Sequence, residues 1–274
     1  MKLLIAVDME GITGVTHFDQ TTPGHPEWQR FRRLMTADVN AAIQGAAEAG
    51  VEDIVVSDGH WDSTNILIEE LDRRARLNSG SPSPFSMVQG IDNGVNAVFF
   101  IGYHARIGTQ NAILDHTWSS SRVSNIWLNG RVVGETGLNG SVCGHFGAPV
   151  LVISGDQSVC TEAKDWIPSI ETVTVKQAVG RNSAECLPPD VTHPMIKAAA
   201  KKAIQRFQAG KGPEPLHTAT PVKIIVEFIY SDMADRTFLM PGVTRLDGKR
   251  VEIQANNMAE AYLACRGLIT LANR

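Results

Sequence analysis

The sequence predicts an α/β protein with a mostly parallel sheet flanked by helices, followed by a small C-terminal α+β subdomain. The chain contains continuous apolar runs, which are typical of strands buried on both faces of a parallel sheet. Stretches with helical periodicity alternate with the runs, as expected for helices that cover such a sheet. Each run ends in polar or small residues, and there are four of them: residues 1–11, 53–60, 97–104 and 149–156.

The first run ends in the sequence Asp8-Met9-Glu10-Gly11. Side chains two residues apart on a strand point to the same face, so Asp8 and Glu10 are expected to project together where the strand leaves the sheet. Two carboxylates at the end of a buried strand are costly unless a positive charge lies between them. A metal ion is the simplest such charge.

The segments between and after these runs show helix and hairpin signals. Apolar residues from Phe31 to Ala46 recur at spacings of three and four, and Gly50 is a suitable helix end. Asn129-Gly130 lies between two apolar arms, which is a strong hairpin signal. The predicted elements are helices over residues 31–50, 64–77, 157–166 and 194–207, and a hairpin over residues 125–133.

A stretch rich in Gly, Pro and Thr divides the chain near its C-terminal end. We interpret residues 1–208 as the α/β metal-binding catalytic domain and residues 209–221 as a linker. Residues 222–274 carry signals for two strands and a final helix from Met258 to Ala272. They are expected to form a small α+β subdomain that packs on the first domain and is a candidate for oligomer contacts.

Composition excludes several classes of partner and location. A formal net charge of −4 and a pI near 6.1 argue against nucleic acid as the main partner. No apolar run approaches the roughly 20 residues of a membrane span, and Asp8 and Glu10 interrupt the apolar start in a way that secretory signals do not. The four cysteines form no C-x-x-C pair, so we expect reduced thiols in a cytoplasmic protein rather than a zinc–thiolate site.

Residues able to bind a metal gather at the ends of the predicted strands and just beyond them. They are Asp8, Glu10, Asp58, His60, His104, His116, Glu135 and Asp156. Mixed imidazole and carboxylate ligands suit zinc or a similar divalent ion. The set exceeds what one catalytic zinc needs and fits a two-metal site with a bridging carboxylate.

A simpler interpretation exists for some of these residues. Asp is a good helix cap, so Asp58 and Asp156 are expected to be turn or cap residues rather than ligands. Glu135, flanked by glycines, is expected to be exposed. Asp8, Glu10, His60 and His104 are the best candidates, because they share one predicted edge of one sheet.

The sequence resembles the zinc-dependent D-aminopeptidase family whose type member lies with bacterial dipeptide-transport genes, and the similarity runs from end to end. The segments that carry it are residues 7–14 (VDMEGITG), 58–60 (DGH), 84–88 (PFSMV), 102–105 (GYHA), 116–117 (HT), 134–139 (GETGLN), 155–156 (GD), 175–178 (VKQA), 180–181 (GR) and 240–242 (MPG).

The resemblance implies a specific site. Asp8, Glu10, His60, His104 and Glu135 correspond to the family's ligands for two zinc ions, with Asp8 as the bridge. His116 corresponds to a catalytic histidine that does not bind metal. The resemblance also implies D-amino-acid substrates and a homo-oligomer, a decamer of two stacked pentamers with the active sites facing an inner chamber.

Together these features predict a metallopeptidase that hydrolyses the N-terminal residue of short peptides, of the D-Ala type. His116 can serve as general acid or base, which we favour, or as a nucleophile. Asn139 is either an oxyanion donor or a loop-stabilising residue. The alternatives are another two-metal amidase, a phosphoesterase, or a metal-binding protein without catalysis.

Overall fold

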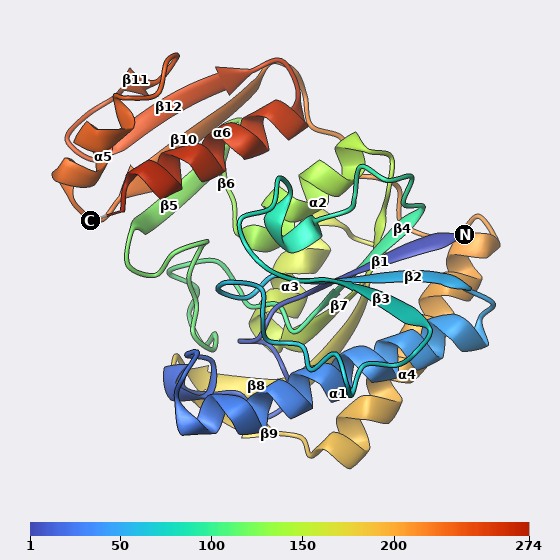
Figure 1. Ribbon diagram of the computed structural model, residues 1–274. Coiled ribbons are helices and arrows are strands. Elements are labelled where there is room, and N and C mark those ends of the chain that lie inside the picture. Colours follow the sequence, from blue (N-terminus) through green and yellow to red (C-terminus); the bar gives the residue numbers. More distant parts are fainter. Residues whose placement is uncertain (274) are drawn as a thin grey trace.

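A seven-stranded sheet forms the centre of the computed structural model, which describes residues 1–273 (Figure 1). Its strand order is β3-β2-β1-β4-β7-β8-β9, and every neighbouring pair is parallel except β8 and β9. The predicted α/β class is therefore confirmed, and the four apolar runs form β1, β2, β4 and β7. The strand bounds are β1 Lys2–Val7, β2 Asp53–Asp58, β3 Ala75–Asn78, β4 Ala97–Ile101, β7 Val150–Asp156, β8 Glu171–Gly180 and β9 Ser183–Cys186.

Alternate residues of the central strands belong to two different cores, one on each face of the sheet. Leu3, Ile5 and Val7 of β1 pack in the core under α1 (Pro26–Glu48) and α4 (Pro189–Gln208). Leu4 and Ala6 pack in the core on the opposite face. This two-sided burial explains why the strand sequence is apolar throughout instead of alternating.

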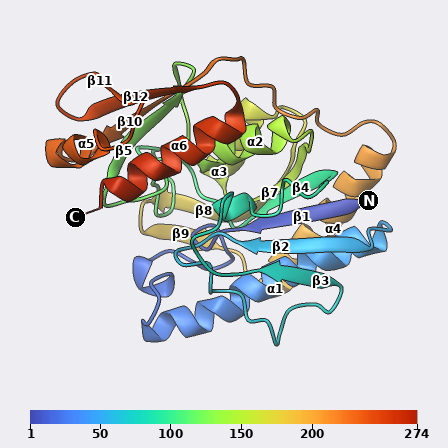
Figure 2. The same ribbon diagram turned by 45° about the horizontal axis from the view of Figure 1, so that its top comes forward.

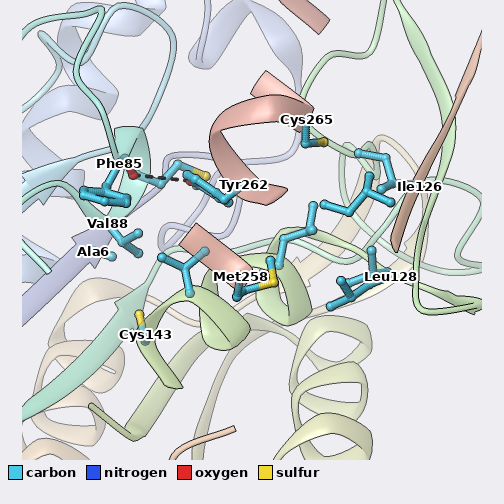
Figure 3. Close-up of a cluster of buried hydrophobic side chains, with 14 of the residues drawn as sticks. Ala6, Phe85, Val88, Ile126, Leu128, Cys143, Met258, Tyr262 and Cys265 are labelled. Atoms are coloured by element: carbon cyan, nitrogen blue, oxygen red, sulfur yellow. Dashed lines mark hydrogen bonds between the residues drawn. The ribbon is translucent and has the colours of Figure 1, made fainter. Parts of the chain in front are cut away.

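The second face of the sheet is covered by α2 (Glu135–His145), α3 (Gln157–Trp166) and the 3₁₀ turn η2 (Ser86–Val88), with α6 (Met258–Leu271) packed on α2. Figure 3 shows side chains from these layers in one apolar cluster, including Ala6 of β1 and Met258 of α6. Tyr262 of α6 donates a hydrogen bond to the Phe85 carbonyl at 3.3 Å. The C-terminal helix is thus joined to the large sheet through one continuous core.

A five-stranded antiparallel sheet lies beyond α6, in the order β11-β12-β10-β5-β6 (Figure 2). The predicted hairpin supplies β5 (Val123–Leu128) and β6 (Arg131–Val132), and β5 pairs with β10 (Val222–Phe228). The other elements are β11 (Thr244–Arg245), β12 (Arg250–Ala255) and α5 (Ser231–Thr237), and η1 (Phe18–Gln20) precedes α1. Residues 209–221 contain no helix or strand. The proposed division into domains stays a prediction.

Most predicted helices are present, but the one expected over residues 64–77 is wrong. Residues 64–74 form turns and lead into β3. The carboxylate of Asp58 accepts hydrogen bonds from the backbone N–H groups of Asn65 and Ile66, at 2.5 and 2.8 Å. These contacts to a neighbouring strand end replace the local bonds of a helix. The helix expected over 194–207 begins five residues earlier, at Pro189, and contains Pro194.

Helix α2 carries no helix signal in the sequence, because three of its eleven residues are glycines of low helix propensity. The structure shows why they are there. A Cβ built on Gly144 would lie 2.0 Å from the Leu216 carbonyl oxygen, and one on Gly137 would lie 2.6 Å from the Trp166 ring. Close packing on every side therefore takes the place of propensity in this helix. No helix within residues 1–273 is long and apolar enough to cross a membrane.

Candidate metal centre

The candidate site lies where the order of the sheet reverses. The chain runs from β1 outward to β2 in one direction and from β4 outward to β7 in the other, so the carboxyl ends of β1 and β4 flank a topological switch point. Asp8 follows β1 directly, and His104 follows β4 by three residues. His60 follows β2, and Glu135 opens α2 behind this edge.

Glycine allows the loops after β1 and β4 to touch. Gly11 donates its backbone N–H to the Gly102 carbonyl at 2.8 Å. A Cβ built on Gly11 would lie 1.9 Å from the Tyr103 carbonyl oxygen, so no other residue fits at this contact. Gly102 has φ +74°, in the left-handed region that glycine adopts freely. This contact fixes Asp8 and Glu10 against the segment that carries His104.

Lys176 of β8 fixes the loop after β1 through hydrogen bonds. Its side chain is fully buried, and its Nζ donates to the carbonyls of Glu10, Ile12 and Val15 at 2.6, 2.9 and 2.7 Å. Burial lowers the pKa of Lys176 to about 8. The three acceptors use all three N–H donors of an ammonium group, so the lysine completes the turn that presents Glu10.

One oxygen of Asp8 faces the first group of donors. Asp8 Oδ1 lies 3.2 Å from His60 Nδ1, which in turn lies 3.1 Å from Glu10 Oε2. Zinc bonds of 2.0–2.2 Å in a tetrahedron place the ligand atoms about 3.3–3.6 Å apart. The three atoms therefore stand close to the spacing of ligands around one ion.

The other oxygen of Asp8 faces a second group. His104 Nε2 lies 3.3 Å from Asp8 Oδ2 and 3.5 Å from Glu135 Oε2. The second oxygen of Glu135 accepts a 2.6 Å hydrogen bond from the Trp118 backbone N–H, which orients the carboxylate. Within residues 1–273, ligand atoms of Asp8, Glu10 and His104 lie within 4.8 Å of one another, and so do ligand atoms of His104, His116 and Glu135, so each set could hold a metal ion.

The hydrogen bonds of the two histidines define which ring nitrogen carries the proton. His60 Nε2 donates to the Thr21 carbonyl at 2.8 Å, and His104 Nδ1 donates to the Ala105 carbonyl at 2.9 Å. A carbonyl can only accept, so in each neutral ring the other nitrogen has its lone pair on the side of the carboxylates, where a metal ion could accept it. Two of the buried atoms at this point, His104 Nε2 and Glu10 Oε2, have no hydrogen-bond partner in the described chain. These orphaned donor atoms fit a metal ion.

The charges of the site also require a cation. Burial opposes ionisation of Asp8, yet His104 and His60 outweigh it and hold the pKa of Asp8 well below its usual range. Burial likewise opposes protonation of both histidines, but Glu135 and Asp8 raise the pKa of His104, and Glu10 and Asp8 raise that of His60, well above the usual value. Without a metal, protons must supply the positive charge that three buried carboxylates demand.

His116 stands at the open side of the group. Its ring stacks on that of His104 with centroids 4.0 Å apart, and its Nε2 lies 4.0 Å from Glu135 Oε1. Its Nδ1 donates to the Leu114 carbonyl at 2.8 Å, so Nε2 is the nitrogen that faces the site. The His116 side chain is 13% exposed and each of the other five side chains at most 5%, so His116 is the most accessible to a substrate.

The structure brings all six predicted site residues together, and the carboxylates of Asp58 and Asp156 are bound by backbone groups nearby, which for Asp58 include the His60 N–H at 3.3 Å. Asp58 binds backbone groups of the loop after β2, and Asp156 caps α3 and accepts the Ile113 N–H, so both are turn and cap residues as expected. Glu135 was expected to be exposed, which is wrong: it is 4% exposed, because α2 is buried between the two sheets. Asn139 bonds to Tyr103 and Tyr262 in the core, which favours its structural role.

Two neighbours of the site were not foreseen. Glu162 of α3 accepts the Arg106 backbone N–H at 2.8 Å, and its other oxygen is buried without a partner. Trp118, with φ +65°, directs its N–H to Glu135. No sequence signal marks either residue, because their contacts join segments that are far apart in the chain.

Carboxylates and imidazoles gathered at the switch point of an α/β fold, with a more exposed histidine beside them, are the arrangement expected of a metal-dependent hydrolase. The comparisons give the particular family: a family model described as D-aminopeptidase, peptidase family M55, matches residues 1–266. The chain belongs to this family of metallopeptidases.

Comparisons of sequence and of structure both find similarity to D-aminopeptidase from Bacillus subtilis over nearly the whole chain. A D-aminopeptidase of strain 168 is 35% identical over 275 residues, which span 100% of this chain and 98% of the relative. A solved structure of a zinc-dependent D-aminopeptidase, described as a self-compartmentalizing protease, superposes with a TM-score of 0.94 at 34% identity and covers 99% of this chain and 98% of its own.

Proposed function

We propose that this protein is a zinc-dependent D-aminopeptidase that removes the N-terminal residue from short peptides of D-amino acids. Two zinc ions would be held by Asp8, Glu10, His60, His104 and Glu135. The observation that carries the proposal is the position of Asp8. Its two carboxylate oxygens face two different donor groups, 3.2 Å from His60 and 3.3 Å from His104, as a bridging carboxylate does.

Bound zinc would supply a Lewis acid for the peptide carbonyl and lower the pKa of water toward about 7. The chain's own groups prepare the site for it. The Thr21 and Ala105 carbonyls keep His60 and His104 in the tautomers that present a lone pair. The Trp118 N–H turns Glu135 so that its Oε2 faces His104.

His116 would accept and donate a proton during hydrolysis. The Leu114 carbonyl holds the ring by Nδ1 and leaves Nε2 free on the side of the site. An accessible imidazole suits proton transfer near neutral pH, so we favour general acid or base catalysis over attack by His116 as a nucleophile.

The remaining parts of the proposal concern assembly and location. The similar structure from Bacillus subtilis is described as self-compartmentalizing. We extend this to a homodecamer of two stacked pentamers of the 29.7 kDa chain, which works on short peptides in the cytoplasm.

The test is hydrolysis of matched dipeptides by purified, zinc-reconstituted protein. D-Ala-D-Ala and L-Ala-L-Ala are incubated with and without a chelator, alongside the Glu10→Gln variant and, as its matched control, the exposed Glu185→Gln. We expect release of D-alanine alone, abolished by the chelator and by Glu10→Gln but retained in Glu185→Gln. Equal cleavage of the L dipeptide would contradict the D preference, and cleavage that survives the chelator would contradict the metal mechanism.

A further inference from the structure

Arg106 lies at the rim of the candidate site. It follows His104 by two residues, and the next residue, Ile107, donates its N–H to the hydroxyl of Thr117, the neighbour of His116, at 3.2 Å. On its other side it packs against Gly134, the residue before Glu135. A Cβ built on Gly134 would lie 2.7 Å from Arg106 Cβ and 3.2 Å from its Cα. Arg106 is therefore wedged between the segments that carry His116 and Glu135.

The backbone of Arg106 is held firmly. Its N–H is accepted by Glu162 Oε2 at 2.8 Å, and its carbonyl accepts from the N–H and hydroxyl of Thr109 at 3.3 and 2.7 Å. The side chain is not committed in the same way. Within residues 1–273, its guanidinium makes one hydrogen bond, from Nη1 to the carbonyl of Ile107 at 3.2 Å, and it forms no ion pair. The residue is partly exposed.

The neighbouring cations are directed to other partners. Lys176 is used by three carbonyls of the Glu10 loop, and Arg181 pairs with Asp115 at 2.8 Å. Arg122 also makes one guanidinium hydrogen bond, but it donates to the Ile269 carbonyl of α6 at 3.1 Å. Arg106 instead lies between the segments of His116 and Glu135, and within residues 1–273 its one hydrogen bond leaves four of its five N–H groups for a ligand.

The chemistry of the ligand follows from the charges. Zinc held by Asp8, Glu10 and Glu135 would be used for the peptide carbonyl and for water, so an anionic group elsewhere on the substrate needs a separate cation at the rim of the site. An unmodified short peptide carries such a group, its C-terminal carboxylate, and a guanidinium fork binds a carboxylate through two parallel hydrogen bonds.

We propose, building on the proposed aminopeptidase function, that Arg106 binds the free C-terminal carboxylate of the substrate and so selects short peptides that end in an acid. A substrate that lacks this carboxylate would leave the guanidinium without a partner and would therefore be a poorer substrate.

The experiment compares each enzyme on two substrates, D-Ala-D-Ala and its C-terminal amide. The readout is the ratio of kcat/KM for the acid to kcat/KM for the amide. In the zinc-loaded wild type we expect a preference for the acid. In Arg106→Met we expect this ratio to fall roughly 10- to 100-fold, the range for loss of a hydrogen bond to a charged group. Arg106→Lys keeps the charge but lacks the guanidinium fork, so its ratio should lie between those of the wild type and Arg106→Met.

The ratio separates recognition from a structural role, because damage to the fold or the metal centre lowers both activities together. Arg76→Met removes an exposed arginine paired with Asp53 at the far edge of the sheet, and it should keep the wild-type ratio. An unchanged ratio in both Arg106 variants would overturn the inference and leave the aminopeptidase intact. Hydrolysis of neither substrate by the zinc-loaded wild type would overturn the proposed function, and this inference with it. Arg106→Lys carries the test if Arg106→Met does not fold.

Discussion

At the scale of single residues, backbone carbonyls set the chemistry of the three histidines of the site. Thr21, Ala105 and Leu114 each accept one ring N–H and leave the opposite nitrogen facing the carboxylates. His60 and His104 are closed in by Asp8 and another acid, whereas His116 is more open and lies farther from the nearest carboxylate. The same residue type thus has two different proposed roles.

Replacing His116 with Ala tests its role. Because the other five residues complete the donor groups around Asp8, we expect zinc content to be unchanged and kcat to fall roughly 10²–10⁴-fold, the usual contribution of a general acid or base. Zinc content is measured by elemental analysis and kcat with the D dipeptide. The exposed His145→Ala is the control. Loss of one zinc per chain would instead assign His116 as a ligand in its arrangement with His104 and Glu135.

His193, outside the site, is expected to affect stability rather than catalysis. Thr13 donates its N–H and hydroxyl to the buried Asp38 carboxylate at 2.9 and 3.0 Å, and His193 Nε2 lies 3.1 Å from the same carboxylate. This contact with Asp38 raises the pKa of His193. The network joins the loop after Glu10 to α1 and α4.

The raised pKa of His193 gives a pH dependence of known sign. The protonated form is favoured by folding, so its stabilisation is complete below the unfolded pKa of about 6.5 and is lost as pH rises through the folded pKa. We expect His193→Gln to lower the free energy of unfolding by about 1 kcal/mol at low pH and by less at high pH. Urea unfolding of both proteins from about pH 6 to 9 measures this, with exposed His217→Gln as control. A pH-independent difference would contradict it.

At the scale of elements, α2 depends on contacts that only glycine permits. Gly137 lies against the Trp166 ring and Gly144 against the backbone of Leu216, in the segment between α4 and β10. The first residue of this helix is Glu135, so the packing that holds α2 also places a proposed zinc ligand.

Replacement of Gly144 by Ala should therefore disturb more than the helix. The added methyl group would meet the Leu216 carbonyl oxygen at 2.0 Å, so the backbone must move. We expect a loss of about 1–3 kcal/mol in the free energy of unfolding. Urea denaturation at fixed protein concentration measures it. The matched control is Gly248→Ala, at an exposed position where the described residues leave a built Cβ without neighbours within 4 Å. It should change the free energy of unfolding by less than about 0.5 kcal/mol. Equal effects at the two positions would refute this account of α2.

At the scale of the whole molecule, the buried carboxylates link metal binding to folding. Asp8 and Glu10 follow β1, Glu135 opens α2 far along the chain, and each of the three is less than 5% exposed. A cation that binds them binds only the folded state, and therefore stabilises the entire fold.

Removal of metal should lower the melting temperature. At an ion concentration 100 times the Kd, binding contributes about 2.7 kcal/mol, and for a chain of this length that corresponds to a shift of roughly 5–10 °C. Thermal unfolding with excess zinc and then with excess chelator measures the difference. The Glu10→Gln variant should show a smaller shift. An unchanged wild-type melting temperature in excess chelator would contradict coupling between zinc binding and folding.

Much of the site was predictable because β-strand geometry is local. The apolar runs identified β1, β2, β4 and β7, and polar residues at their carboxyl ends identified Asp8, Glu10, His60 and His104 before any fold was known. The two-residue period of a strand predicted that Asp8 and Glu10 lie together, but β1 ends at Val7, and the turn held by Gly11 and Lys176 is what presents Glu10. Residue type alone made Glu135 one candidate among eight, and its role as a ligand rests on the resemblance, because a glycine-rich segment carries no signal of burial.

The tertiary structure alone decided how these strands are ordered and what lies between them. The position of β1 beside β4, which creates the switch point, depends on pairing between segments about 95 residues apart, such as Leu3 with Ala97. The same holds for three other features: the turns that replace the helix expected over residues 64–77, the burial of α2, and the position of Arg106 against Gly134 and Glu162. Each results from contacts between distant segments, whose packing and hydrogen bonds outweigh the local preferences that a sequence records.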